Sequence, residues 1–235
     1  MTDPASPSIH IESLLDGARR ARGVVAVIDV FRAFTSGAVA LANGAARIIM
    51  VGSVDEALAL RAAGLGDVCI GETRGRKPDA FDHGNSPSEI VGVDFTGRTL
   101  IQRTSAGTQG IVAAAAAADR LYAASLVTAS ATARAMRAGG PPRITLVAMG
   151  ENGEERTDED ELCALHLRHL LTGHAGDPEA ARRMIAAGEA VTRFHDPARP
   201  DSPIEDVAIA LAIDRYDFAI RVRLEDGHPV GRRED

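Results

Sequence analysis

The chain has 235 residues, 45% of them hydrophobic but only 3% aromatic, and a formal net charge of −7 at pH 7. This length and apolar content suit a single α/β domain over residues 1–235. The acidic balance and the scarcity of aromatic rings argue against a nucleic-acid partner, which calls for basic surfaces and rings that stack on bases. No apolar run reaches the roughly 18 residues of a membrane span, so we expect no membrane partner.

The two cysteines, Cys69 and Cys163, stand far apart and lack the spacing of a disulfide framework or a zinc site. Residues 1–10 lack the basic and apolar regions of a signal peptide. These observations predict a cytoplasmic protein. A homo-oligomer, most simply a homodimer, is expected because such assemblies are common among soluble proteins.

Short β-branched runs alternate with alanine-rich stretches along the chain. Predicted strands cover residues 24–30, 47–51, 67–70, 98–103, 120–124, 143–149 and 218–224. Predicted helices cover residues 32–43, 53–64, 107–118, 128–138 and 157–171, and two more begin at Pro178 and Pro203. This alternation predicts an α/β fold, a three-layer α/β/α sandwich with a largely parallel or mixed sheet.

Two helix starts carry the spacing of a capping box. Ser53 and Glu56 are three residues apart at the start of one predicted helix. Ser202 and Glu205 repeat this spacing beside Pro203. We therefore expect both serines to cap helices.

A long polar loop, residues 71–87, interrupts the alternation. It contains Glu72, Arg74, Asn85 and Ser86. Long loops in compact domains are usually functional. Arginine suits phosphate oxygens, and carboxylates suit Mg²⁺. The alternatives are a solvated charged loop and, at residues 85–87, a simple turn or helix cap.

In open α/β sheets, ligands bind beyond the carboxyl ends of the strands. This rule nominates four residues that close or follow predicted strands: Asp29, Glu72, Thr104 and Glu151. An acid such as Asp29 at the end of a buried strand is costly unless it is paired or binds metal. Arg32 could bind phosphate or simply pair with Asp29, and the sequence leaves both possibilities open.

Two further segments carry polar groups at predicted helix starts. Residues 103–108 hold Thr104, Ser105, Gly107 and Thr108, and backbone N–H groups at such a place bind anions. Residues 158–160 are all acidic and end in Asp160. Plain helix capping and a favourable interaction with the helix dipole are the non-functional alternatives.

Other phosphatase schemes fit poorly. Phe31 stands where an aspartate-nucleophile phosphatase would place a second Asp, and Gly75 stands where a cysteine phosphatase loop starting at Cys69 would need Arg. The histidines show no metal-ligand spacing, and no Gly-x-Ser-x-Gly elbow is present.

In their order along residues 24–171, these blocks resemble the 2-phosphosulfolactate phosphatase family. The similarity is carried by Asp29 with Arg32, Ala42-Asn43-Gly44-Ala45, Gly71-Glu72, Phe81-Asp82 with Gly84-Asn85-Ser86-Pro87, Thr104-Ser105 with Gly107-Thr108, and Glu159-Asp160. The resemblance implies an α/β/α fold, Mg²⁺ as cofactor, and hydrolysis of a phosphate ester on a sulfonated hydroxy acid, a step towards coenzyme M.

From this resemblance we expect a phosphatase that acts on a small anionic phosphate ester, 2-phosphosulfolactate or a related phospho-hydroxy acid. The expected catalytic residues are Asp29, Arg32 and Glu72, and the expected Mg²⁺ ligands are Asp29, Glu72 and Asp160. The expected substrate-binding residues are Arg74, Asn85, Ser86, Thr104, Ser105, Gly107 and Thr108. Either water or Asp29 attacks phosphorus.

Three residues depart from the family pattern: Thr73, His83 and Ala106. They fall in the expected substrate pocket, so the resemblance supports the reaction class more firmly than the substrate. Thr73 and Ala106 also motivate an alternative, a non-catalytic binder of anionic metabolites on the same scaffold.

Overall fold

The structure, a computed structural model, describes residues 7–174 and 177–235; part of the N-terminal segment that lacks a signal pattern thus lies outside the described residues. A mixed nine-stranded sheet runs through the described residues in the order β1-β7-β2-β6-β8-β9-β3-β5-β4. The strands are β1 (Ser8–Ser13), β2 (Gly23–Ile28), β3 (Arg47–Met50), β4 (Val68–Gly71), β5 (Thr99–Arg103), β6 (Ala118–Ala124), β7 (Arg143–Ala148), β8 (Ala219–Glu225) and β9 (His228–Glu234).

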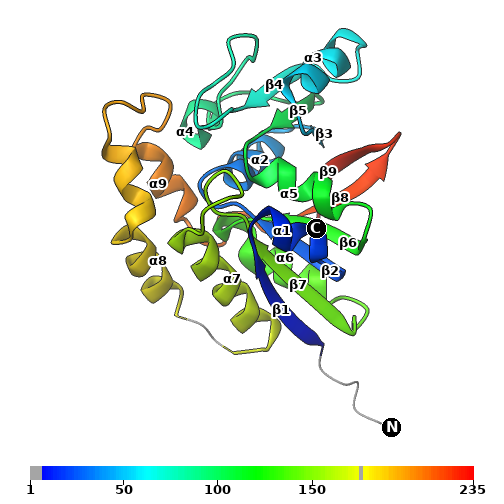
Figure 1. The fold of residues 1–235 in the computed structure, drawn as a ribbon, viewed down its shortest axis with the longest axis vertical. Coiled ribbons are helices and arrows are strands. Elements are labelled where there is room, and N and C mark those ends of the chain that lie inside the picture. Colours follow the sequence, from blue (N-terminus) through cyan, green and yellow to red (C-terminus); the bar gives the residue numbers. More distant parts are fainter. Residues whose placement is uncertain (1–6, 175–176) are drawn as a thin grey trace.

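The sheet consists of two parallel blocks joined by a hairpin. One block contains β1, β7, β2 and β6, and the other contains β3, β5 and β4. The antiparallel hairpin β8–β9 pairs with β6 on one side and with β3 on the other. Figure 1 shows the β3–β5–β4 block with α3 at one end of the molecule and β1, β7 and β2 towards the other.

Helices cover both faces of the sheet, as the sequence predicts. They are α1 (Leu14–Arg20), α2 (Ala33–Ala42), α3 (Val54–Ala62), α4 (Pro87–Ile90), α5 (Gly107–Ala114), α6 (Ala129–Arg137), α7 (Asp158–Leu171), α8 (Pro178–Ala186) and α9 (Glu205–Ala210), with 3₁₀ segments η1 (Leu126–Thr128) and η2 (Glu189–His195). Val25 and Val27 of β2 pack into a core with α1, α2 and α5. Val24, Ala26 and Ile28 point into a second core with α6, α7, α8 and α9. The three-layer α/β/α sandwich is therefore confirmed.

The helix starts agree with the sequence in one case and differ in another. The backbone N–H of Glu56 donates to Ser53 Oγ at 3.1 Å, which confirms that cap. The Ser202 cap is wrong, because α9 begins only at Glu205, and the residue before it, Ile204, offers no side-chain cap. A turn over Pro203 delays the helix: the Asp206 N–H bonds to the Pro203 carbonyl.

The sequence prediction also missed elements near both ends of the chain. β1 carries Ile9 and Ile11 in alternation with polar residues, which was a readable strand signal, and α1 is only seven residues long. The hairpin turn before β9 places Asp226 and Gly227 at φ 51° and 84°, the positive values that a tight two-residue turn requires. The Asp-Gly pair was thus a readable hairpin signal. In the part of the chain that the structure describes, no helix is long and apolar enough to cross a membrane.

Candidate active site

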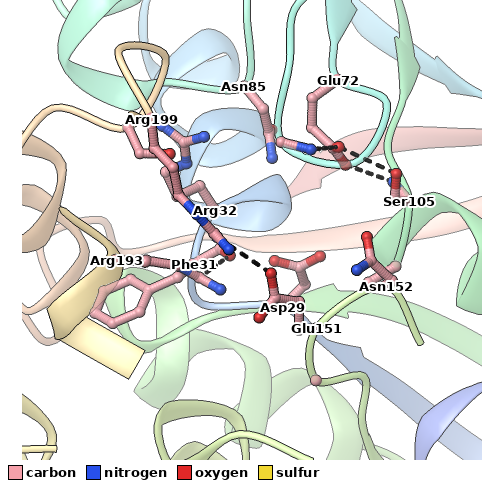
Figure 2. Close-up of a pocket in the computed structure, with 14 residues that line it drawn as sticks. Asp29, Phe31, Arg32, Glu72, Asn85, Ser105, Glu151, Asn152, Arg193 and Arg199 are labelled. Atoms are coloured by element: carbon pink, nitrogen blue, oxygen red, sulfur yellow. Dashed lines mark hydrogen bonds and ion pairs between the residues drawn. The ribbon is translucent and has the colours of Figure 1, made fainter. Parts of the chain in front are cut away.

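A pocket lies where the C-terminal ends of β2, β4, β5 and β7 meet (Figure 2), the location that the strand-end rule predicts. Of the four nominated residues, Asp29, Glu72 and Glu151 line it, whereas Thr104 does not. Its lining consists of Asp29, Phe31, Arg32, Glu72, Gly75, Asn85, Ser105, Ala106, Gly150, Glu151, Asn152, Arg193, Arg199 and Ser202.

Asp29 follows β2 and is only 5% exposed. Its Oδ1 accepts the Ala33 N–H and its Oδ2 accepts the Gly107 N–H, each at 2.9 Å. The carboxylate therefore ties β2 to the first residues of α2 and α5. Burial raises the pKa of Asp29 to about 6, and the charge of Glu72 adds to this rise, although the two N–H donors and Arg193 oppose it.

Glu72 follows β4 and holds two loops together. Its Oε1 accepts the Ser105 N–H at 2.5 Å, and its Oε2 accepts the Ser105 hydroxyl at 3.0 Å and the Gly75 N–H at 2.6 Å. Gly71 precedes it at φ 133°, where a Cβ would lie 1.9 Å from the Arg103 carbonyl oxygen. Only glycine fits there, so this close approach of β4 to β5 fixes the position of Glu72.

Arg32 lines the pocket from the start of α2. Its Nη1 donates to Asp206 Oδ2 and to the Asp201 carbonyl oxygen, both at 2.6 Å. The purely structural Asp29–Arg32 pair, which the sequence left open, is therefore wrong: the buried ion pair of Arg32 is with Asp206.

Two arginines that the sequence prediction missed complete the cationic side of the pocket. Arg193 of η2 donates to the Phe31 carbonyl oxygen at 2.7 Å and lies 3.7 Å from a carboxylate oxygen of Glu159. Arg199 lies 3.3 Å from Glu151 Oε1. Both arginines come from the segment between α8 and α9, which has no strand end or glycine-rich motif to mark it in the sequence.

The structure brings some of the predicted substrate-binding residues into the pocket and keeps others behind it. Asn85 and Ser105 line the pocket. Thr104 and Thr108 are buried and cap each other, since each hydroxyl accepts the other residue's backbone N–H at 3.1 and 2.8 Å. The two threonines therefore stabilise the start of α5.

The remaining predicted residues also lie outside the lining. Arg74 is exposed, with φ 49°, and its backbone N–H donates to the Ser105 hydroxyl at 2.8 Å. The Ser86 hydroxyl contacts Asp206 Oδ1 at 2.7 Å and caps α4. Gly107 reaches the site through its N–H bond to Asp29.

Asp160 lies behind Asp29, at the start of α7. Its Oδ1 accepts the Val30 N–H at 2.8 Å and its Oδ2 accepts the Gly150 N–H at 2.9 Å, so it joins the ends of β2 and β7. Burial, then the charges of Glu159 and Asp29, raise the pKa of Asp160 well above its usual value. Burial likewise raises the pKa of Glu159 to about 7, against the influence of Arg193. Two buried acids, Glu159 and Asp160, thus lie behind the pocket and do not line it.

Sequence comparison identifies the family. Residues 9–200 match the family described as 2-phosphosulpholactate phosphatase. The chain belongs to this family. It is 35% identical, over 80% of its length and 76% of the relative's, to a probable 2-phosphosulfolactate phosphatase of Thermus thermophilus. A protein of the same name from Bacillus subtilis is 31% identical over 88% of this chain and 90% of the relative.

The family match ends at residue 200, but the site does not. Ser202 lines the pocket, and both residues that accept hydrogen bonds from Arg32, Asp201 and Asp206, follow the matched segment. The motifs of the 2-phosphosulpholactate phosphatase family thus lie within residues 9–200. Part of the support of the site comes from residues that follow them.

The family resemblance implies Mg²⁺, and the acids at the pocket fit it in part. Within residues 7–174 and 177–235, no three His, Cys, Asp or Glu side chains gather closely enough to hold a metal by themselves. Mg²⁺, however, commonly takes one or two protein carboxylates and completes its shell with water and phosphate oxygens. Asp29 and Glu72 line the same pocket, and burial together with their mutual repulsion favours a bound cation. Asp160 lies outside the lining, and its role as a ligand stays a prediction.

Proposed function

We propose that this protein is a Mg²⁺-dependent phosphatase that hydrolyses a small anionic phosphate ester, 2-phosphosulfolactate or a related phospho-hydroxy acid. The observation that carries the proposal is the composition of one pocket. Its walls bring the carboxylates of Asp29 and Glu72 together with the guanidinium groups of Arg32, Arg193 and Arg199. The names of the relatives from Thermus thermophilus and Bacillus subtilis support the same substrate.

The arginines bind different anionic groups of the substrate. Guanidinium groups bind phosphate and sulfonate oxygens with two parallel hydrogen bonds. Arg32 is buried and fixed by Asp206, so we assign it to the phosphoryl group, whose position must be held most accurately. Arg199 is half-exposed and paired with Glu151, so we assign it to the second anion of the substrate.

The polar groups near Asp29 complete the reacting centre. The Asn85 side chain lines the pocket, and its Oδ1 is buried without a hydrogen-bond partner among the described residues, which leaves it free to accept a hydrogen bond from a water molecule. Asp29 and Glu72 would hold Mg²⁺, which supplies positive charge that stabilises the phosphoryl oxygens in the transition state. Backbone N–H groups of Ala33 and Gly107 keep the Asp29 carboxylate in place as the substrate binds and leaves.

We infer that water, and not Asp29, attacks phosphorus. Both carboxylate oxygens of Asp29 already accept a backbone N–H bond, which fixes their direction and draws charge from them. Rapid quenching of the enzyme with labelled substrate tests this inference. We expect no label on the protein, and a stable phosphoenzyme that disappears in Asp29→Asn would overturn it.

Phosphate release tests the function itself. The protein is incubated with 2-phosphosulfolactate, 2-phospholactate and ethyl phosphate, with Mg²⁺ or with a chelator. We expect release from the first two substrates, with Mg²⁺ only. Binding of every ester without release would instead identify the non-catalytic binder, and release that survives the chelator would remove Mg²⁺ from the proposal.

A further inference from the structure

Asp206 of α9 is fully buried and connects two parts of the candidate active site. Its Oδ2 accepts a hydrogen bond from Arg32 Nη1 at 2.6 Å. Its Oδ1 accepts from the Ser86 hydroxyl at 2.7 Å, and from the backbone N–H and hydroxyl of Ser88 at 3.0 and 2.6 Å. Each carboxylate oxygen therefore serves a different segment, the start of α2 and the start of α4.

The contact with Oδ2 sets the orientation of the Arg32 guanidinium. A guanidinium group carries five N–H donors in one plane. Both observed acceptors, Asp206 Oδ2 and the Asp201 carbonyl oxygen, use Nη1. Nε and Nη2 donate to no group within the described residues, and the Phe194 ring lies 5.7 Å from the guanidinium carbon. The bond to Asp206 thus fixes the Nη1 end of the guanidinium group. The opposite edge, formed by Nε and Nη2, is left to bind an anion in the pocket.

The contacts with Oδ1 set the position of Asn85. Ser86 follows it directly, Ser88 stands three residues after it, and both are anchored to Asp206. The Asn85 backbone is held from the other side, where its carbonyl oxygen accepts the Ser36 hydroxyl at 3.0 Å. With its backbone held in this way, Asn85 lines the pocket that Arg32 also lines.

We propose that Asp206 is a positioning residue of the active site, which sets the geometry of phosphoryl binding through Arg32 and Asn85. The proposal rests on the proposed function in so far as the bound anion is the phosphoryl group of the substrate. Asp206 itself does not line the pocket, and it follows the segment that matches the family. Neither the motifs nor the family match therefore points to it.

The variant Asp206→Asn keeps the size of the side chain but cannot accept all four hydrogen bonds, because one oxygen becomes an NH₂ donor. Its control is Glu205→Gln, which removes a charge from the exposed neighbouring residue of α9. The measurements are the Kd of inorganic phosphate by calorimetry, kcat/KM for 2-phosphosulfolactate, and the half-saturating concentration of Mg²⁺.

For Asp206→Asn we expect phosphate affinity and kcat/KM to fall roughly 10- to 100-fold, as for other residues that orient a binding group. The half-saturating Mg²⁺ concentration should stay within about twofold, because the contacts of Asp29 and Glu72 do not involve Asp206. Glu205→Gln should behave as wild type. Unchanged phosphate affinity and kcat/KM in folded Asp206→Asn would overturn the proposal.

A double-mutant cycle separates positioning from general stability. If Asp206 acts through Arg32, adding Asp206→Asn to Arg32→Gln should lower phosphate affinity by less than about twofold further. Fully additive losses would overturn the proposal. Asp206→Glu keeps the charge but moves it by one methylene, so it provides the same comparison if Asp206→Asn does not fold.

The outcomes for wild type keep this proposal separate from the proposed function. Wild type that binds phosphate but releases none from any ester would overturn the phosphatase proposal. The ratio of the phosphate Kd values of Asp206→Asn and wild type would still decide the role of Asp206. Wild type without measurable affinity for phosphate would overturn both.

Discussion

Asp29 and Gly107 contact each other although their strands, β2 and β5, are separated by four others in the sheet. The Gly107 N–H donates to Asp29 Oδ2 at 2.9 Å. A Cβ at position 107 would lie 2.8 Å from that same oxygen and 2.8 Å from the Ala33 Cβ. The site therefore needs a residue without a side chain at the first position of α5.

From this contact we predict that Gly107→Ala displaces the Asp29 carboxylate. The overpacking should cost about 1–3 kcal/mol of stability. Turnover should fall on the order of 100-fold, as expected when a reacting group moves by about 1 Å. Gly92→Ala is the matched control, since a Cβ there meets nothing within 4 Å. Thermal melting and phosphate release check both variants, and equal activity in the two would refute the need for glycine at 107.

Asp29→Asn tests the assignment of Asp29 as a Mg²⁺ ligand. Asn keeps the size of the side chain and one carbonyl oxygen but removes the charge that a hard cation needs. Arg32 keeps its partner Asp206, so the change leaves no buried cation without a counter-charge. One backbone N–H, of Ala33 or Gly107, loses its acceptor, which should cost about 1–3 kcal/mol.

We expect Asp29→Asn to lower turnover and Mg²⁺ affinity together. The measurements are the melting temperature without metal and phosphate release as a function of Mg²⁺ concentration. Glu154→Gln, an exposed acid in the loop after β7, serves as the control. A variant that is destabilised but shows the wild-type dependence on Mg²⁺ would rule out Asp29 as a ligand.

The sequence predicted the Asp29 strand and its neighbours because buried parallel strands are continuous apolar runs that end abruptly at a polar residue. It could not predict that Asp29 and Gly107 meet. Three antiparallel pairings separate β2 from β5, so a flat sheet would place their C-terminal ends at opposite edges. The two residues meet because α5, which follows β5, packs against β2 and starts beside the C-terminal end of that strand.

The arginines of the pocket also show which contacts could not be predicted from the sequence. Arg32 stands beside a strand end and was found, but Arg193 and Arg199 lie in a segment placed only by tertiary contacts. Arg193 is held between the Phe31 carbonyl and Glu159, which are far from it in the sequence. Long-range pairings of this kind leave no local pattern, whereas capping spacing and strand ends do.

The buried acid Glu159 predicts a pH dependence of stability. Its pKa rises from 4.5 to about 7 on folding, mainly through burial. The folded protein therefore holds a proton that the unfolded chain releases near pH 4.5. The stability that this proton contributes is fully present below that pH and is lost as the pH rises through about 7.

Melting without metal between pH 4.5 and 8 checks this prediction in wild type and in Glu159→Gln. We expect wild type to lose more stability than the variant as the pH rises. His166, whose pKa burial lowers, titrates in both proteins and cancels in the comparison. Parallel curves for the two proteins would show that Glu159 is ionised throughout this range.

Arg199 should determine which phosphate esters the enzyme prefers. It is half-exposed, and its ion pair with Glu151 at 3.3 Å can yield to an incoming anion, because such exposed pairs contribute only about 0–1 kcal/mol.

Arg199→Gln should raise KM for 2-phosphosulfolactate about 10-fold, equivalent to about 1.4 kcal/mol. The inhibition constant of ethyl phosphate, measured against 2-phosphosulfolactate, should change by less than about twofold, because this ester has no second anion to bind. Arg182→Gln on α8, an exposed arginine paired with Glu179, should leave both values unchanged. If Arg199→Gln weakens both esters equally, Arg199 binds the phosphoryl group itself, and the division of roles between Arg32 and Arg199 is wrong.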